Sequence, residues 1–253
     1  RYLGSWRGAP PAPGAEPAPP PLRPTEVVLV HRPGSAQSNI AVGNLALGPR
    51  DPAYFAITVG NKILGQGADS RLFRILREER SWTYGASSGV TRRLGPGYFS
   101  AGTETRNPVT DSALVELMTQ LKRIRTEPVA DSELTAAKGY LVGSFPRTIE
   151  TPQQIASQVS TVKLLGLGDD YLRTYRERLA AVTQADILEA ARRVIKPDSA
   201  VIVVVGDGQT IYEKLRPVAP VRIVDIDGKP ITADDLRPKA GPLAFDRAHL
   251  VAR

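Results

Sequence analysis

The feature that most constrains this chain is a helical pattern that runs directly into a strand pattern between residues 70 and 84. Leu72, Phe73 and Leu76 recur at the spacing that places side chains on one face of a helix. A strand pattern follows from residue 83. Arg77 is predicted near the end of the helix and Tyr84 near the start of the strand.

The order of the other patterns predicts the fold class. Residues 27–31 and 40–47 are predicted strands, residues 83–91 and 98–103 form a predicted hairpin, and helices are predicted to begin near residues 51, 70, 111, 131, 152, 171 and 183. Residues 200–205 are a continuous β-branched run, which is typical of a strand covered on both faces. This order predicts an α+β fold, a mixed and mainly antiparallel sheet with helices packed on one face.

Local signals predict where some helices begin and end. Residues 151–154 read Thr-Pro-Gln-Gln, a capping box with proline at the first helical position. The helix that follows is predicted to present Ile155, Val159 and Val162 on its apolar face. Gly65 is a predicted C-cap for the helix before it.

Composition divides the chain into four parts. Residues 9–24 are rich in proline and alanine, which favours an extended linker over a helix or strand. We expect residues 1–8 to be the tail of an upstream domain and residues 25–215 to form the folded domain. Residues 216–253 have little periodicity and are expected to form a C-terminal extension that wraps around the domain or hangs free.

The chain is basic, with a net charge of +7 and a pI of about 9.8. A nucleic-acid site would need basic residues gathered on one face, whereas here they are spread among acidic residues. We therefore expect a solvated surface and no nucleic-acid partner, with an acidic substrate or partner still open. No apolar run approaches the ~20 residues of a membrane span.

The residues available for catalysis are few. The chain has no cysteine and two histidines, His31 and His249. A zinc peptidase helix needs two histidines four residues apart with a glutamate as base, and neither histidine has such a partner. Both are predicted to be surface or strand-edge histidines. The sequence therefore predicts no catalytic and no metal-ligating residue in this chain.

Two further motifs are interpreted as structural. Residues 206–208 read Gly-Asp-Gly after a strand and are predicted to be a turn that opens no phosphate-cradling helix. From residue types alone, Arg77 could pair with Glu78 or with carbonyl groups, and Tyr84 could simply pack on the sheet.

The pattern as a whole nevertheless resembles a known family. The run carrying Leu64-Gly65, Ser70-Arg71-Leu72, Leu76-Arg77-Glu78-Glu79 and Thr83-Tyr84-Gly85 resembles the C-terminal domain of the insulinase-like (pitrilysin) zinc peptidases. Later segments agree in order, among them residues 143–145, 150–156, 165–171, 182–192 and 203–207. The resemblance covers roughly residues 1–215 and implies the fold of the insulinase-like and mitochondrial processing peptidases.

The resemblance also implies a function. In this family an arginine and a tyrosine seven residues later bind the substrate peptide, and these positions match Arg77 and Tyr84. The zinc lies in another half that carries His-x-x-Glu-His, and peptides dock as an added strand on a sheet edge. The resemblance therefore implies a non-catalytic, peptide-binding domain of a zinc metalloendopeptidase, inactive alone, with no cofactor of its own.

Two arrangements and one rival function stay open. The zinc half is either the upstream domain or a separate subunit, and the Arg77/Tyr84 pair favours the second. The rival is a structural scaffold module of the same fold with no peptide turnover. The resemblance favours a bacterial periplasmic or secreted location.

Overall fold

The computed structural model describes residue 8 and residues 20–237. Most of the expected upstream tail, most of the proline-rich linker and the end of the C-terminal extension lie outside the described residues. The helices and strands are β1 (Glu26–His31), β2 (Gln37–Leu45), α1 (Tyr54–Gly65), α2 (Arg71–Phe73), η1 (Arg74–Glu79), β3 (Ala86–Thr91), β4 (Tyr98–Arg106), η2 (Asn107–Val109), α3 (Thr110–Thr126), α4 (Asp131–Ser144), η3 (Phe145–Ile149), α5 (Pro152–Leu165), α6 (Tyr171–Ala181), α7 (Gln184–Val194), η4 (Pro197–Ser199), β5 (Val201–Gly206), α8 (Gly208–Leu215), β6 (Val221–Val224) and η5 (Asp234–Leu236).

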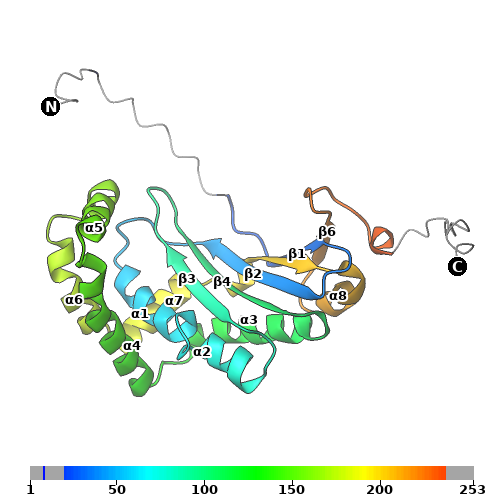
Figure 1. The fold of residues 1–253 in the computed structure, drawn as a ribbon, viewed down its shortest axis with the longest axis horizontal. Coiled ribbons are helices and arrows are strands. Elements are labelled where there is room, and N and C mark those ends of the chain that lie inside the picture. The colour runs from blue at the N-terminus through cyan, green and yellow to red at the C-terminus, as the bar shows by residue number, and fades with distance from the viewer. Residues whose placement is uncertain (1–7, 9–19, 238–253) are drawn as a thin grey trace, which may run out of the picture.

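The sheet is mixed and mainly antiparallel, as predicted. Its strand order is β3-β4-β2-β5-β1-β6. The pairs β3–β4, β4–β2 and β2–β5 are antiparallel, whereas β5–β1 and β1–β6 are parallel. Figure 1 shows α1, α3 and α7 along one face of this sheet, so the expected α+β architecture is confirmed.

The core lies between that face and the helices. Inward-facing strand residues such as Leu29, Phe99 and Ile202 are buried, as are the helix residues Ile57 and Leu117. Strand residues alternate between the two faces because the side-chain period of a strand is two. The buried positions therefore form one continuous hydrophobic core on the helix side.

The opposite face of β5 is only partly buried, which corrects the expectation for residues 200–205. The strand is buried only at alternate positions, and Val201 keeps 50% of its surface exposed. The outer valines instead form rows with β1, because Val203 lies opposite Val28 and Val205 opposite Val30. A continuous β-branched run therefore does not distinguish a covered outer face from an open aliphatic one.

The capping box at the start of α5 is present as predicted. The Gln154 amide donates to Thr151 Oγ1 (3.3 Å), and Gln154 Oε1 accepts from the Thr151 amide (2.9 Å). The predicted apolar face is only partly covered: Val162 is buried, but Ile155 and Val159 remain 46% and 44% exposed. The reason is that α5 packs mainly against the short η3 rather than over the sheet.

Gly65 has a different role from the predicted C-cap. It is the last residue of α1, and the capping position falls on Gln66, whose backbone is extended. A Cβ at position 65 would lie too close to the Ser88 backbone nitrogen. Asn61 and Ser88 also exchange hydrogen bonds there, so Gly65 allows α1 to pack closely against β3.

The chain past residue 205 is more ordered than the sequence indicates. The Gly-Asp-Gly turn opens α8, because Asp207 Oδ1 accepts from the Gln209 amide (3.1 Å), so a helix of eight residues follows the predicted turn. Beyond residue 215, β6 then adds a parallel strand beside β1. With four residues, β6 is too short for a periodicity signal.

His31 corrects the expectation of a surface or strand-edge histidine. It ends β1, which lies between β5 and β6, and only 8% of its surface is exposed. Its Nδ1 accepts a hydrogen bond from the Gly208 amide (3.0 Å), which links β1 to the start of α8. His249 lies outside the described residues.

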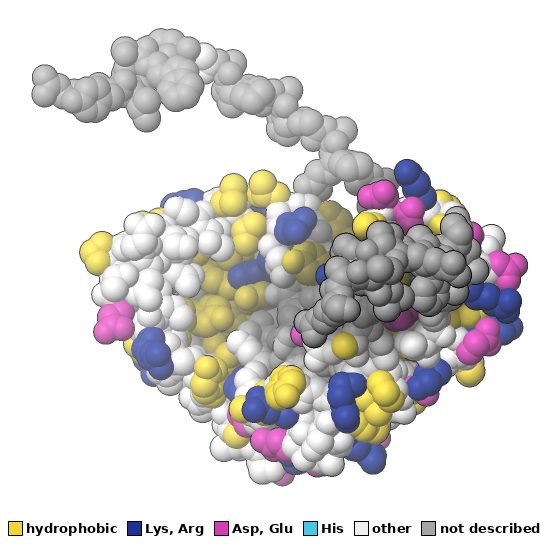
Figure 2. All heavy atoms as spheres, turned by 45° about the vertical axis from the view of Figure 1, so that its right-hand side comes forward, with side chains coloured by type: hydrophobic (Ala, Val, Ile, Leu, Met, Phe, Trp, Pro, Cys, Tyr) yellow, Lys and Arg dark blue, Asp and Glu magenta, His cyan; other side chains and the backbone are white. Residues whose placement is uncertain are grey.

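The surface has no single basic stripe on the face seen in Figure 2. Lys and Arg side chains there are interspersed with Asp and Glu. In the described part of the chain, no helix combines the length and the apolar character needed to cross a lipid bilayer.

Candidate functional site

The predicted amphipathic helix at residue 70 is present but changes its winding. The short α2 continues directly into η1, a π-helix. The Arg80 amide donates to the Ile75 carbonyl (3.0 Å), five residues back, and Ser81 follows with a positive φ of 54°. Because π-turns are rare and occur often at functional sites, the segment is a candidate on geometry alone.

The first half of this segment is a buried anchor. Ser70 Oγ donates to the Gly67 carbonyl (2.7 Å). Arg71 donates from Nε and Nη2 to the two carboxylate oxygens of Glu133 on α4 (2.7 and 2.6 Å). These hydrogen bonds hold the pKa of Glu133 below its usual value, although partial burial opposes the shift. The Ser70-Arg71-Leu72 part of the motif therefore has a structural role.

The second half brings the two predicted site residues together. Arg77 Nη1 donates to the main-chain carbonyl of Tyr84 (2.9 Å), and its guanidinium lies 4.8 Å from the centre of the Phe73 ring. Tyr84 lies two residues before β3 and is 85% exposed. The contact is thus between the arginine side chain and the tyrosine backbone, which leaves the tyrosine ring and hydroxyl outside the pair.

Two threonines of β4 fix the segment that carries Tyr84. Thr105 Oγ1 donates to the Trp82 carbonyl (2.7 Å), and Thr103 Oγ1 donates to the Gly85 carbonyl (3.0 Å). Both threonines are buried. Sequence reasoning missed them, although hydroxyls at two successive inward positions of a strand signal hydrogen-bond partners nearby.

A cavity of about 400 Å³ opens beside the pair. Its walls are formed by Gln37, Arg77, Ser81, Trp82, Thr83, Tyr84, Glu104, Thr105 and Arg106. The lining offers guanidinium donors, a phenol and one carboxylate, which suits binding of a polar chain more than covalent chemistry.

The adjacent strand β3 lies at the edge of the sheet. Among the described strands it pairs with β4 alone, and Figure 1 shows it at the margin of the sheet. An edge strand presents backbone N–H and C=O groups that another extended chain can pair with.

The described residues do not fit a zinc ion. None of their His, Cys, Asp and Glu side chains form a group of three or more that could hold a metal. His31 already uses Nδ1 within the fold.

Comparison with known proteins identifies the family of this chain. A family model described as "Peptidase M16 inactive domain" matches residues 1–141, more than half of the chain. The chain belongs to the peptidase M16 inactive domain family. The resemblance to insulinase-like zinc peptidases is thereby confirmed.

Individual relatives support the same assignment. An uncharacterized zinc protease of Streptomyces coelicolor is 28% identical over 68% of this chain. The M16 inactive domain from Pseudomonas fluorescens is 26% identical with a TM-score of 0.69 over 74% of this chain. The periplasmic protease PqqL of Escherichia coli, 16% identical over 81% of this chain and 23% of its own, has a TM-score of 0.64 and shows the fold alone.

This M16 inactive domain matches less than half the length of each of these relatives. It spans 38% of the Streptomyces protein and 45% of the Pseudomonas fluorescens chain.

Proposed function

We propose that this M16 inactive domain binds the peptide substrate of a zinc metalloendopeptidase without cleaving it, and that Arg77 and Tyr84 contact that peptide. The observation that carries the proposal is the Arg77–Tyr84 contact beside the cavity. Arg77 holds the Tyr84 carbonyl at 2.9 Å, while the tyrosine side chain stays almost fully exposed. Both residues also line the cavity beside the pair.

The chemistry of the pair suits a peptide backbone. A guanidinium has five N–H donors, and Arg77 uses one of them on Tyr84. The other donors can reach substrate carbonyls in a fixed fork. The Tyr84 hydroxyl can donate to a carbonyl oxygen that gains negative charge during attack.

Strand β3 supplies the rest of the binding surface in this proposal. A peptide that adds as a strand to an edge gains main-chain hydrogen bonds independent of its sequence. Tyr84 lies just before β3, so a peptide paired with that edge would pass both residues of the pair. This arrangement supports broad rather than narrow sequence selectivity.

The proposal requires a catalytic partner half. Since this chain spans less than half of its longer relatives, we assign the zinc and the His-x-x-Glu-His motif to another half, either an upstream domain or a separate subunit. The Arg77/Tyr84 pair favours a separate subunit. We also propose a bacterial periplasmic or secreted location, which the family resemblance favours.

Peptide binding tests the proposal directly. The probe is a fluorescein-labelled, net-neutral, unstructured peptide of about 20 residues, and the measurement is fluorescence anisotropy. Arg77→Ala removes charge-assisted hydrogen bonds of ~1.5–3 kcal/mol, so we expect binding at least ~10-fold weaker. Tyr84→Phe is expected to weaken binding less. Arg74→Ala, an exposed arginine on the same segment paired with Glu79, is the charge-matched control.

A cleavage assay then separates substrate binding from scaffolding. The chain is mixed with a zinc-loaded half that carries His-x-x-Glu-His, and cleavage of the same peptide is followed. We expect turnover only in the mixture, reduced by Arg77→Ala and by Tyr84→Phe but not by Arg74→Ala. Normal assembly with no peptide binding would instead establish the scaffold function, whereas peptide binding indifferent to Arg77 would overturn the role given to Arg77.

A further inference from the structure

A second cavity, of about 540 Å³, lies where the start of α1 meets α6 and the β3–β4 connection. The arginines and aromatic residues that line it are Arg50, Tyr54, Phe55, Arg92, Tyr171 and Arg178. It shares no lining residue with the cavity beside Arg77. Three guanidinium groups and three aromatic rings therefore meet in a place that the peptide-binding proposal does not use.

Arg92 is the fixed centre of this cavity. Its guanidinium carbon lies 3.4 Å from the centre of the Tyr54 ring and 5.3 Å from that of Tyr171. Nη2 donates to the Tyr171 hydroxyl (2.6 Å) and Nη1 donates to the Pro49 carbonyl (3.3 Å). Stacking and neutral acceptors orient the group but leave its charge uncompensated.

The charge of the other two arginines is also unbalanced. Within the described part of the chain, neither Arg50, Arg92 nor Arg178 has a carboxylate within ion-pair distance. Asp51, the one acidic residue of the lining, pairs with Arg193 instead. Three like charges around one cavity favour an anionic occupant, and guanidinium forks match carboxylate and phosphate geometry.

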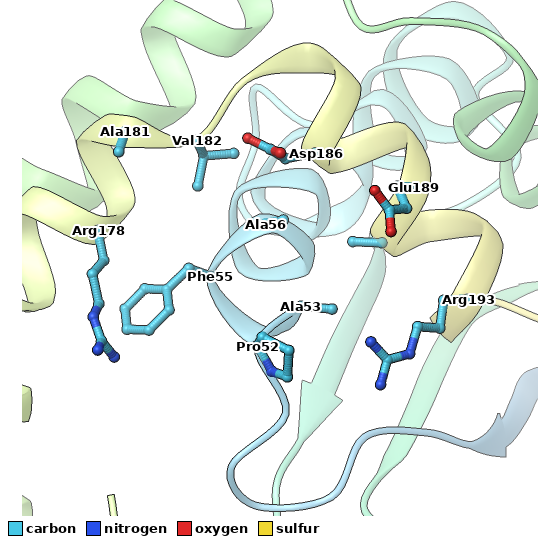
Figure 3. Close-up of a pocket in the computed structure, with 11 residues that line it drawn as sticks. Pro52, Ala53, Phe55, Ala56, Arg178, Ala181, Val182, Asp186, Glu189 and Arg193 are labelled. Atoms are coloured by element: carbon cyan, nitrogen blue, oxygen red, sulfur yellow. The ribbon is translucent and has the colours of Figure 1, made fainter. Parts of the chain in front are cut away.

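An adjoining cavity makes the two sides of the site differ in charge (Figure 3). This smaller space, of about 300 Å³, shares Phe55 and Arg178 with the cavity around Arg92, and its apolar lining includes Ala56 and Val182. Figure 3 shows Arg178 on one side of the Phe55 ring and the carboxylates of α7 on the other. An anion is thus attracted on the Arg178 side and repelled on the α7 side, while an apolar group can lie over Phe55.

We propose that this cavity binds an oxyanion, a carboxylate or a phosphate, carried on an aromatic or apolar group. The guanidinium groups of Arg50, Arg92 and Arg178 hold the oxyanion. The rings of Tyr54 and Phe55 contact the apolar part. The site is independent of peptide binding at Arg77, so either proposal can fail alone.

Calorimetric titration with three small probes tests the site. Benzoate and phenyl phosphate carry the two candidate oxyanions on the same ring, and benzamide is a neutral analogue of benzoate. We expect an anion to bind with a dissociation constant of ~1 mM, about −4 kcal/mol, and benzamide to bind far more weakly. The tighter of the two anions identifies whether the source is a carboxylate or a phosphate.

Two exposed arginines of α6 provide the matched variants. Arg178→Gln is expected to weaken anion binding about tenfold, because one charge-assisted hydrogen bond is lost. Arg176→Gln removes the same charge from the same helix outside the cavity lining and is expected to leave binding unchanged. Both positions are exposed, so both variants keep the fold. Equal binding of benzoate and benzamide, no heat with either anion, or equal losses in the two variants would overturn the proposal.

Discussion

Arg71 and Arg77 lie six residues apart on one helical segment, and the fold treats them in opposite ways. The Arg71 side chain is 9% exposed and donates two hydrogen bonds to Glu133. Arg77 is exposed and donates to a single backbone carbonyl. An arginine whose charge is neutralised by a carboxylate holds the fold together, whereas one left with free donors can bind something else. The residue type does not distinguish the two roles, because the environment sets them.

Removing Arg71 is expected to have the largest effect on stability. Arg71→Ala leaves the Glu133 carboxylate partly buried without its partner, and breaking a buried pair in this way costs ~3–5 kcal/mol. Arg77→Ala breaks one exposed hydrogen bond and is expected to cost less than ~1 kcal/mol. Urea unfolding of both variants measures the difference. Equal losses of stability in the two variants would contradict the different roles given to Arg71 and Arg77.

The same comparison predicts that the free energy of unfolding depends on pH, and this effect is of intermediate size. Hydrogen bonds from Arg71 lower the folded-state pKa of Glu133, so the stability they contribute is present above the unfolded-state pKa of ~4.3. That stability is lost as pH falls through the lower folded-state pKa. The difference in the free energy of unfolding between wild type and Glu133→Gln is therefore expected to become smaller below about pH 4.

Glu127→Gln is the matched control for this pH dependence. Arg123 also lowers the pKa of Glu127, but that pair is exposed to solvent and screened. Urea unfolding is measured at a series of pH values. The difference in the free energy of unfolding from wild type is expected to be smaller for Glu127→Gln than for Glu133→Gln. A difference for Glu133→Gln that is constant with pH would contradict the role given to Arg71.

The smallest expected effect comes from the segment that carries Tyr84. Thr105→Val removes the hydrogen bond to the Trp82 carbonyl and is expected to cost ~1 kcal/mol. It is also expected to weaken peptide binding, because Tyr84 is no longer held in place. Thr119→Val, which removes an exposed hydroxyl bonded within α3, is expected to change neither. Thermal unfolding and the anisotropy assay measure the two effects separately.

The sequence predicted those parts of the fold that rest on local signals. The capping box at Thr151 and the helices between residues 110 and 194 depend on contacts within a few residues. The hairpin and the mixed sheet followed from the order of the strands. Arg77 and Tyr84 were identified from the family pattern, and the structure brings them together.

Features set by distant segments were not predictable from the same signals. The outer face of β5 is only partly buried although its residues are aliphatic, because coverage depends on other elements. Gly65 is required by the approach of Ser88, which lies 23 residues later in the sequence and on another element. Thr103 and Thr105 contact the Tyr84 segment only after the sheet has formed.

The π-turn of η1 makes the positions of Arg77 and Tyr84 depend on the number of residues in the segment. A π-helical hydrogen bond spans five residues, whereas an α-helical one spans four. The π-turn therefore contains one residue more than an α-helical turn would, and this extra residue lies close to the buried Leu76. Each residue of an α-helix turns the chain by ~100°, and losing one residue here would rotate or shorten everything up to Tyr84. The loss or gain of a single residue in this segment is therefore expected to separate Arg77 from Tyr84.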